Sequence, residues 1–267
     1  MEILIRPSAA HVARLVARLV ADRVRAKPDL VLGCATGRTM EAVYDELVAE
    51  HGGGRVDLRR VRTFNLDEYV GLAPEDPRSY HHYMRERFFD RIGLPPERTR
   101  LPNGVASDLA AEARAYERAI VEAGGIDLQL VGLGETGHIG FNEPLSALMS
   151  RTREKALTPT TRAQNAEMFG GDPTAVPSRA LTMGVGTILE AREVLLVATG
   201  AAKAGILARA TEGPITARIS ATALQLHPNC KVVVDEAAAG ALEGGEYYRF
   251  AYAHEPEWGP YRADPRL

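Results

Sequence analysis

The sequence predicts an α/β protein in which a mostly parallel sheet lies between two layers of helices. Three observations support this prediction: short continuous apolar runs, amphipathic runs of helix length between them, and polar clusters where apolar runs end. Continuous apolar runs are typical of strands buried on both faces, as in parallel sheets. Strands that alternate with helices indicate crossover connections. Because ligands bind beyond the carboxyl ends of such strands, we expect the polar clusters to converge there.

The elements are predicted from their hydrophobic period. Val and Leu recur at helical spacing within residues 12–20, with Arg and Asp between them, which predicts an amphipathic helix over residues 9–26. The apolar run at residues 29–33 predicts a buried strand, and residues 40–50 resume a helical pattern. Further strands are predicted at residues 61–66, 128–132, 194–199 and 231–234. Further helices are predicted at residues 79–91, 108–122 and 201–211.

Residues 144–180 are the least regular part of the chain. They contain scattered prolines and have no strong period, as expected of a functional excursion or lid. The chain has no internal repeat or low-complexity tract, and its glycine turn at residues 51–54 is too short for a domain linker. We therefore expect one domain over residues 1–267, with residues 144–180 as a lid.

Composition and charge exclude several classes of protein. Apolar residues make up 45% and charged residues 25% of the chain, a balance typical of globular proteins and not of disordered ones. A net charge of −3 with no basic stretch argues against nucleic-acid binding. Cys34 and Cys230 are too few for a disulfide framework, and charges interrupt every apolar run before membrane-spanning length. We expect a cytoplasmic protein that binds neither nucleic acid nor membrane.

The first polar cluster, Gly33-Cys-Ala-Thr-Gly-Arg-Thr39, follows the first buried strand. Backbone N–H groups at a helix N-terminus, with glycine and threonine beside them, suit a phosphate group, and Arg38 can add a bidentate contact. The alternative is a tight turn in which Thr39 caps the next helix. Neither a Walker loop nor a dinucleotide-binding glycine pattern is present. Cys34 is expected to be a buried cysteine and not a nucleophile.

The other clusters supply acids and a histidine. Asp67-Glu68 ends a predicted strand, where a partly desolvated carboxylate can act as a general base, although a solvated loop acid has the same sequence signature. Glycines flank His138, and Glu143 is near enough in sequence to orient its imidazole, although a buried structural histidine remains an alternative. His81 and His82 face different ways on a helix, so they are not expected to share a metal ion. We expect both side chains to be solvated.

Together these stretches resemble the glucosamine-6-phosphate deaminase (isomerase) family. Its members carry a Thr-Gly-x-Thr loop, a Leu/Met-Asp-Glu-Tyr segment and a Gly-His-Ile-x-Phe-Asn-Glu-Pro loop in the order found here. The likeness runs from about Leu30 to Asp235. It implies a Rossmann-like three-layer α/β sandwich of the sugar-phosphate isomerase and CoA transferase type, usually oligomeric. It also implies conversion of glucosamine 6-phosphate and water into fructose 6-phosphate and ammonia, without metal or organic cofactor.

The resemblance also implies roles for single residues. Asp67 matches the base that moves a proton between C2 and C1 of the sugar, His138 the group that assists ring opening, and Glu143 the acidic partner of the histidine. The positions that match the phosphate site are Thr36, Gly37, Thr39 and Lys203. The candidate allosteric positions, which in some members bind a phosphosugar, are Arg153, Lys155 and Ser146; a solvated face is the alternative for the two cations.

Two positions depart from the family pattern. Thr136, which we also count among the candidate catalytic residues, stands where the family commonly has Asp or Asn. It brings no negative charge to the catalytic group, so His138 is expected to depend on Glu143 alone. Glu167 stands where the family usually has an arginine that binds the substrate phosphate, and a carboxylate there repels phosphate. Because Arg38 occupies a loop position often held by a small residue, we expect it to pair with Glu167 and to restore the phosphate site.

Three alternative functions remain open at this point. The departures at Thr136 and Glu167 are compatible with a different amino sugar, such as galactosamine phosphate or an unphosphorylated sugar. Related folds hydrolyse 6-phosphogluconolactone with a similar glycine-rich loop. Related domains also serve as sugar-phosphate sensors without catalysis, although retention of Asp67, His138 and Glu143 favours an enzyme.

Overall fold

The large sheet of this protein is fully parallel. The computed structural model describes residues 1–264 and 266–267, and within this part of the chain seven strands form the sheet in the order β1-β10-β9-β6-β2-β3-β5. Its strands are β1 (Glu2–Arg6), β2 (Val31–Cys34), β3 (Arg62–Asn65), β5 (Thr99–Arg100), β6 (Leu128–Gly132), β9 (Glu193–Ala198) and β10 (Cys230–Asp235). The expected domain of residues 1–267 also includes residue 265, which lies outside the described residues.

The order of the strands fixes where a ligand is expected. From β5 to β10 the order is that of a doubly wound dinucleotide-binding sheet, with β1 added at the edge beside β10. The chain first builds outward from β2 through β3 to β5, and then builds from β6 in the other direction through β9 to β10. The direction reverses between β2 and β6, and the crevice at such a reversal is the usual ligand site. The predicted Rossmann-like α/β fold is thereby confirmed.

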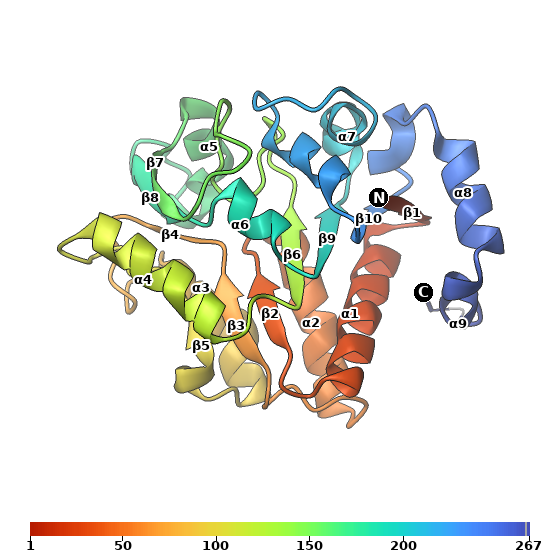
Figure 1. Cartoon of the computed structure of the whole chain (residues 1–267), viewed down its shortest axis with the longest axis horizontal. Helices are drawn as coiled ribbons and strands as arrows, with labels where there is room; N and C mark the ends of the chain where they lie inside the picture. The colour runs from red at the N-terminus through yellow and green to blue at the C-terminus, as the bar shows by residue number, and fades with distance from the viewer. Residues whose placement is uncertain (265) are drawn as a thin grey trace.

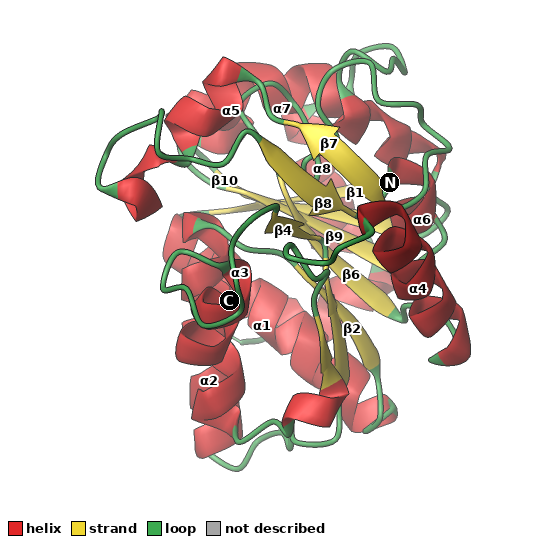
Figure 2. Ribbon diagram, turned by 90° about the vertical axis from the view of Figure 1, so that its left-hand side faces the viewer, coloured by secondary structure: helices red, strands yellow, loops and turns green. Residues whose placement is uncertain are grey.

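Helices cover both faces of the large sheet, with α1 and α2 on one face and α4 and α6 on the other (Figure 2). The helices are α1 (Ala9–Ala26), α2 (Arg38–Gly52), α3 (Tyr80–Met84), α4 (Leu109–Glu122), α5 (Pro159–Gln164), α6 (Val185–Leu189), α7 (Ala204–Thr211), α8 (Gly245–His254) and α9 (Gly259–Arg262). On the α4 face, the rings of Phe64 and Tyr116 meet edge to face at 5.7 Å. On the α2 face, the Tyr44 hydroxyl donates to the Ala35 carbonyl at 2.6 Å. These contacts fasten the sheet between its two helical layers.

A second, smaller sheet stands above the carboxyl ends of the large one (Figure 1). In the described part of the chain it consists of β4 (Asp67–Tyr69), β8 (Arg179–Thr182) and β7 (Arg153–Ala156), paired antiparallel in the order β4-β8-β7. An aromatic cluster packs beside it and contains Tyr69, Tyr80, Phe141 and Phe169. Residues 144–180 therefore contain β7, α5 and the first half of β8, although their sequence showed no period.

The predicted elements are present, with boundaries that differ by a few residues. The predicted helix at residues 79–91 is α3, followed by one wide helical turn (Arg85–Phe89) and one tight turn (Asp90–Ile92). The sequence reasoning missed β1, β5, the small sheet, α5, α6, α8 and α9. Of these, α8 lies beside β1 at the edge of the molecule (Figure 1). Among the described residues, no helix combines the length and the apolar character needed to cross a membrane.

Candidate active site

A cleft of about 430 Å³ opens at the carboxyl ends of the strands, where the chain direction reverses between β2 and β6. This volume is in the range of small-molecule sites. The loops after β2, β3, β6 and β9 contribute Thr36, Asp67, His138 and Lys203 to its lining. The polar clusters that end separate strands in the sequence thus converge on one site. In particular, Asp67 and His138 face the same cleft, as the resemblance required.

The loop after β2 presents the N-terminus of α2 to the cleft. Gly37 is the N-cap residue and has φ of 109°, a backbone conformation that side chains other than glycine rarely adopt. The helix begins at Arg38, so Thr39 lies in the first turn, and the alternative in which Thr39 caps the helix is wrong. Thr36, Gly37, Arg38 and Thr39 all line the cleft. The N–H groups of a first helical turn have no partner within the helix and favour anions.

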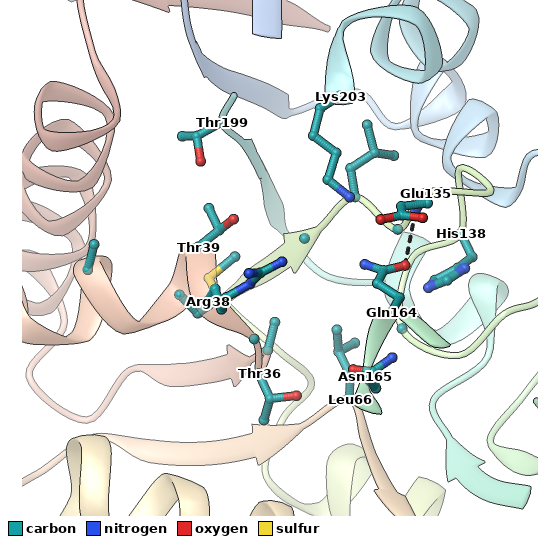
Figure 3. Close-up of a pocket in the computed structure, with 18 of the residues that line it drawn as sticks. Thr36, Arg38, Thr39, Leu66, Glu135, His138, Gln164, Asn165, Thr199 and Lys203 are labelled. Atoms are coloured by element: carbon teal, nitrogen blue, oxygen red, sulfur yellow. Dashed lines mark hydrogen bonds between the residues drawn. The ribbon is translucent and has the colours of Figure 1, made fainter. Parts of the chain in front are cut away.

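Lys203 faces this loop from the opposite side of the cleft. In Figure 3 the side chains of Arg38 and Lys203 enter the same space from opposite walls, and the Lys203 amine points toward Glu135. Burial lowers the pKa of Lys203, while nearby Glu135 raises it and Arg38 lowers it further. Two cations and a helix N-terminus around one space make this end of the cleft suited to an anion.

Asp67 is the buried carboxylate of the site, with only 5% of its surface exposed. It begins β4, and its register partner in β8 is Thr182. The loop after β6 crosses close to it, since a Cβ built on Gly140 would lie 3.4 Å from Asp67 Oδ2. Burial, and then the charge of Glu68, raise the pKa of Asp67 to about 8. The interpretation of this residue as a solvated loop acid is therefore wrong, and its basicity suits proton abstraction near neutral pH.

His138 is also buried in the cleft lining, and its ring packs against the backbone of Gly134. A Cβ at position 134 would lie 2.2 Å from His138 Nε2, so only glycine fits beside the imidazole. His138 Nδ1 lies 2.8 Å from Thr136 Oγ1 and 3.8 Å from Glu143 Oε2. The expectation that His138 depends on Glu143 alone is therefore wrong, because the Thr136 hydroxyl is its nearer partner. Burial lowers the pKa of His138, and the charge of Glu143 opposes this shift.

Glu143 is itself held in place by the next segment of the chain. Its Oε1 accepts hydrogen bonds from the Thr158 backbone N–H at 2.8 Å and from the Thr158 hydroxyl at 3.2 Å. Its Oε2 is buried and has no hydrogen-bond partner within the described residues. Thr158 is the N-cap residue of α5. Oε2 is thus the free acceptor for an imidazole that gains a proton at Nδ1, and α5 is tied to that acceptor.

Arg38 and Glu167 form the expected ion pair. Arg38 Nη1 lies 3.5 Å from Glu167 Oε2, and both side chains are largely exposed, at 81% and 77%. Arg38 lines the cleft, whereas Glu167 lies on a 3₁₀ turn (Ala166–Phe169) outside the cleft lining. An ion pair this exposed is weak, of about 0–1 kcal/mol. Arg38 therefore has a partner that a stronger anion can replace.

The three candidate allosteric residues lie outside the cleft lining. Arg153 and Lys155 are on β7, where Arg153 Nη1 donates to Asn142 Oδ1 at 2.7 Å. Arg153 is half-buried, and burial lowers its pKa. The Ser146 hydroxyl is buried without a hydrogen-bond partner in the described part of the chain. The interpretation of Arg153 as part of a solvated face is wrong, because this side chain is directed toward the buried Asn142.

Sequence reasoning missed several residues of the site. Tyr80, Glu135, Gln164, Asn165 and Thr199 also line the cleft. Gln164 and Asn165 end α5 within the predicted lid, and Gln164 Oε1 accepts from the Glu135 backbone N–H at 3.2 Å (Figure 3). The only signal for them was that the predicted lid is irregular. Their place in the cleft arises from tertiary packing of α5 over the loop after β6.

Cys34 and His81, which were also considered from the sequence, are held by burial and by hydrogen bonding, respectively. Cys34 is buried, and burial raises the pKa of its thiol to about 12, so it is protonated at neutral pH. His81 is not a solvated residue as expected, because its Nδ1 lies 2.8 Å from the buried Glu68 Oε2. In the described part of the chain, no cluster of three or more His, Cys, Asp and Glu side chains is arranged to hold a metal ion.

Known proteins are similar to this chain in sequence and in fold. The family described as glucosamine-6-phosphate isomerases/6-phosphogluconolactonase matches residues 6–233. The chain belongs to this family. A Streptomyces coelicolor protein named glucosamine-6-phosphate deaminase is 48% identical over 258 residues, which cover 97% of this chain and 99% of that protein.

Two solved structures of the family differ in how close they are to this chain. A monomeric glucosamine-6-phosphate deaminase has a TM-score of 0.88 at 41% identity and covers 90% of this chain and 100% of its own. A 6-phosphogluconolactonase from Trypanosoma cruzi has a TM-score of 0.74 at 21% identity, over 91% of this chain and 97% of its own. The lactonase shares the fold, whereas the deaminase shares fold and sequence.

Proposed function

We propose that this chain converts glucosamine 6-phosphate and water into fructose 6-phosphate and ammonia, without a metal or organic cofactor. The observation that carries the proposal is that a buried carboxylate of raised pKa, Asp67, and a buried imidazole, His138, line one cleft with an anion-binding helix N-terminus. An aldose-ketose shift requires a base, a proton donor for the ring oxygen and a clamp for the phosphate. The sequence relatives named glucosamine-6-phosphate deaminase support this choice of substrate.

In the proposed reaction each group of the site has one role. Thr36, Thr39, the first turn of α2 and Lys203 bind the phosphate. The Thr136 hydroxyl donates to His138 Nδ1, so that Nε2 carries a proton. As the hemiacetal opens, Nε2 gives this proton to the ring oxygen and takes the proton of the C1 hydroxyl, so the imidazole ends neutral. Asp67 takes the proton from C2 and returns it at C1, while one amine proton is transferred to the C1 oxygen, which turns the C2 amine into an imine and the C1 aldehyde into an alcohol. Water adds to the imine carbon, and the nitrogen leaves as ammonia, so atoms and charge balance.

Arg38 and Glu167 are proposed to regulate how the phosphate binds. In the free protein Arg38 pairs with Glu167 at 3.5 Å. A phosphate dianion near Lys203 attracts Arg38 more strongly than one exposed carboxylate does, so Arg38 moves to the phosphate. Glu167 is then left in water, where it remains solvated.

The decisive assay is ammonia release over a panel of amino sugars with and without the 6-phosphate, run beside a lactone-hydrolysis assay. The proposal expects ammonia and fructose 6-phosphate from glucosamine 6-phosphate, and little from the unphosphorylated sugar. Faster turnover of galactosamine 6-phosphate would reassign the substrate. Hydrolysis of 6-phosphogluconolactone without deamination would make the chain a lactonase, and binding without turnover would make it a sensor.

Further parts of the proposal concern the assembly and its control. Residues 1–267 are proposed to act as one domain, with residues 144–180 as a lid over the cleft. Arg153, Lys155 and Ser146 are proposed to form an allosteric phosphosugar site, for which sigmoidal kinetics lost in Arg153→Ala is the test. A cytoplasmic homo-oligomer is also proposed, and light scattering tests the oligomeric state directly. A monomer is the competing outcome, in line with the solved relative described as monomeric.

A further inference from the structure

The residue next to the proposed base is a second buried carboxylate. Successive side chains of a strand point to opposite faces, so Asp67 meets the cleft while Glu68, one residue later in β4, points away from it. Glu68 is 0% exposed. Two acids in succession at a strand end are ordinarily solvated. Here both are buried, and they differ in their hydrogen-bond partners.

Glu68 is held by four hydrogen bonds. Its Oε1 accepts from the backbone N–H groups of Tyr69 at 2.8 Å and Tyr80 at 3.0 Å. Its Oε2 accepts from the His81 backbone N–H at 3.0 Å and lies 2.8 Å from His81 Nδ1. A carboxylate that accepts this many hydrogen bonds is fixed in position. Asp67 has no comparable set of donors within the described residues.

The other titratable groups around Asp67 do not supply a fixed negative charge beside it. Tyr69, Tyr80 and Tyr116 are buried, and burial raises the pKa of each phenol, so these groups are neutral. Gly140, Phe141 and Thr182, which pack against Asp67 from the loop after β6 and from β8, carry no ionisable side chain. The charged or titratable side chains that share the cleft with Asp67 are Tyr80, His138, Arg38, Glu135 and Lys203.

We propose that Glu68 is a positioning residue whose fixed charge strengthens Asp67 as a base, and that the charge at position 81 controls this effect. The inference rests on the proposed function and adds a residue to its mechanism. Like charges in a poorly hydrated site disfavour a second ionisation, which increases the proton affinity of the neighbour. A positive charge at position 81 would lie beside Glu68 and weaken that repulsion. The raised pKa of Asp67, with Glu68 as its second cause after burial, agrees with this geometry.

The test compares two variants at the half-buried position 81. His81→Arg places a permanent positive charge beside Glu68, and His81→Asn is the neutral control that keeps a hydrogen-bond donor. For each, kcat/KM for glucosamine 6-phosphate is measured from pH 5 to pH 10. We expect the limb that rises with pH to lie about one unit lower in His81→Arg than in His81→Asn, from two unit charges at an effective dielectric constant of about 20. We also expect a lower plateau, because a weaker base abstracts the proton more slowly.

Glu68→Gln is the second variant. Removal of the charge shifts the same limb to lower pH, while a purely structural role lowers the rate at every pH and leaves the limb in place. Should Glu68→Gln fail to fold, the His81 pair still decides the question. Coincident limbs in His81→Arg and His81→Asn overturn the inference.

A second readout separates this inference from the proposed function. The carboxyl carbon of Asp67 is titrated by NMR in the free wild-type protein and in both His81 variants, without substrate. A lower midpoint in His81→Arg supports the inference even if the wild-type protein releases no ammonia, an outcome that refutes only the function. Equal midpoints together with normal ammonia release refute only the inference.

Discussion

Asp67→Asn is expected to abolish turnover and, above neutral pH, to stabilise the fold. Loss of a positioned general base lowers kcat by about 10²- to 10⁴-fold. The stabilisation arises because the folded protein holds a charge at position 67 that burial and Glu68 make unfavourable. Asparagine has a similar shape and no charge, so it removes that cost.

The size and pH window of the stabilisation follow from the pKa of Asp67. The ordinary pKa of an aspartate is 3.8, and in the folded protein the pKa of Asp67 is about 8. Below about pH 4 the group is protonated in both states, and between pH 4 and pH 8 only the folded state keeps the proton. Wild-type stability from this group is therefore fully present below pH 4 and is lost as the pH rises to 8. Four pKa units set an upper limit of about 6 kcal/mol, and we expect at least about 2 kcal/mol at pH 9.

The assay is urea unfolding of Asp67→Asn and wild type at several pH values from 4 to 9. The difference in unfolding free energy should increase with pH and level off near pH 8. Asp57→Asn is the control, because Asp57 is exposed and Arg59 lowers its pKa to about 2, so its contribution does not change in this range. A difference between Asp67→Asn and wild type that is the same at every pH would refute the reasoning.

Three further substitutions test the rest of the site. Thr136→Val removes the hydroxyl 2.8 Å from His138 Nδ1 and should lower kcat about 10-fold with KM unchanged. Thr136→Ser, which retains a hydroxyl, should keep most of the activity. Equal losses of kcat in both variants would contradict the role of the hydroxyl. Glu167→Gln frees Arg38 and should lower KM for glucosamine 6-phosphate about threefold. Arg38→Ala should raise this KM. An unchanged KM in both variants argues against the transfer of Arg38 from Glu167 to the substrate phosphate. Gly134→Ala displaces the imidazole of His138 and should reduce kcat at least about 100-fold. Circular dichroism verifies that the variant is folded. A folded and fully active variant would contradict this prediction.

Hydrophobic period was sufficient to predict the framework but not the small sheet. β2 and β6 are buried along nearly their whole length, so their apolar runs were distinct. β7 reads Arg-Glu-Lys-Ala and is only half-buried, and β4 reads Asp-Glu-Tyr, which resembles a solvated turn. The acids of β4 are buried because one faces the cleft and the other binds the first turn of α3. A local window of sequence contains neither reason.

The site was predictable where its chemistry depends on residue type and order, and less so where it depends on distance. Asp67, His138 and the loop at residues 36–39 could be named because unusual residues stand at strand ends. The contact of Thr136 with His138 was missed because an expected charge was absent there and the hydroxyl was not considered as a partner. Gln164 and Asn165 enter the cleft only through packing of α5, which sequence alone does not specify.

The hydrogen bonds between Glu143 and Thr158 connect α5 directly to His138, the proposed proton donor. Thr158 opens α5 and holds one Glu143 oxygen, while the other oxygen faces the imidazole. A displacement at the start of α5 therefore moves the carboxylate beside His138. In the proposed reaction, substitutions at Thr158 should accordingly alter the rate of ring opening, whereas substitutions at Gln164 and Asn165 also change the cleft lining.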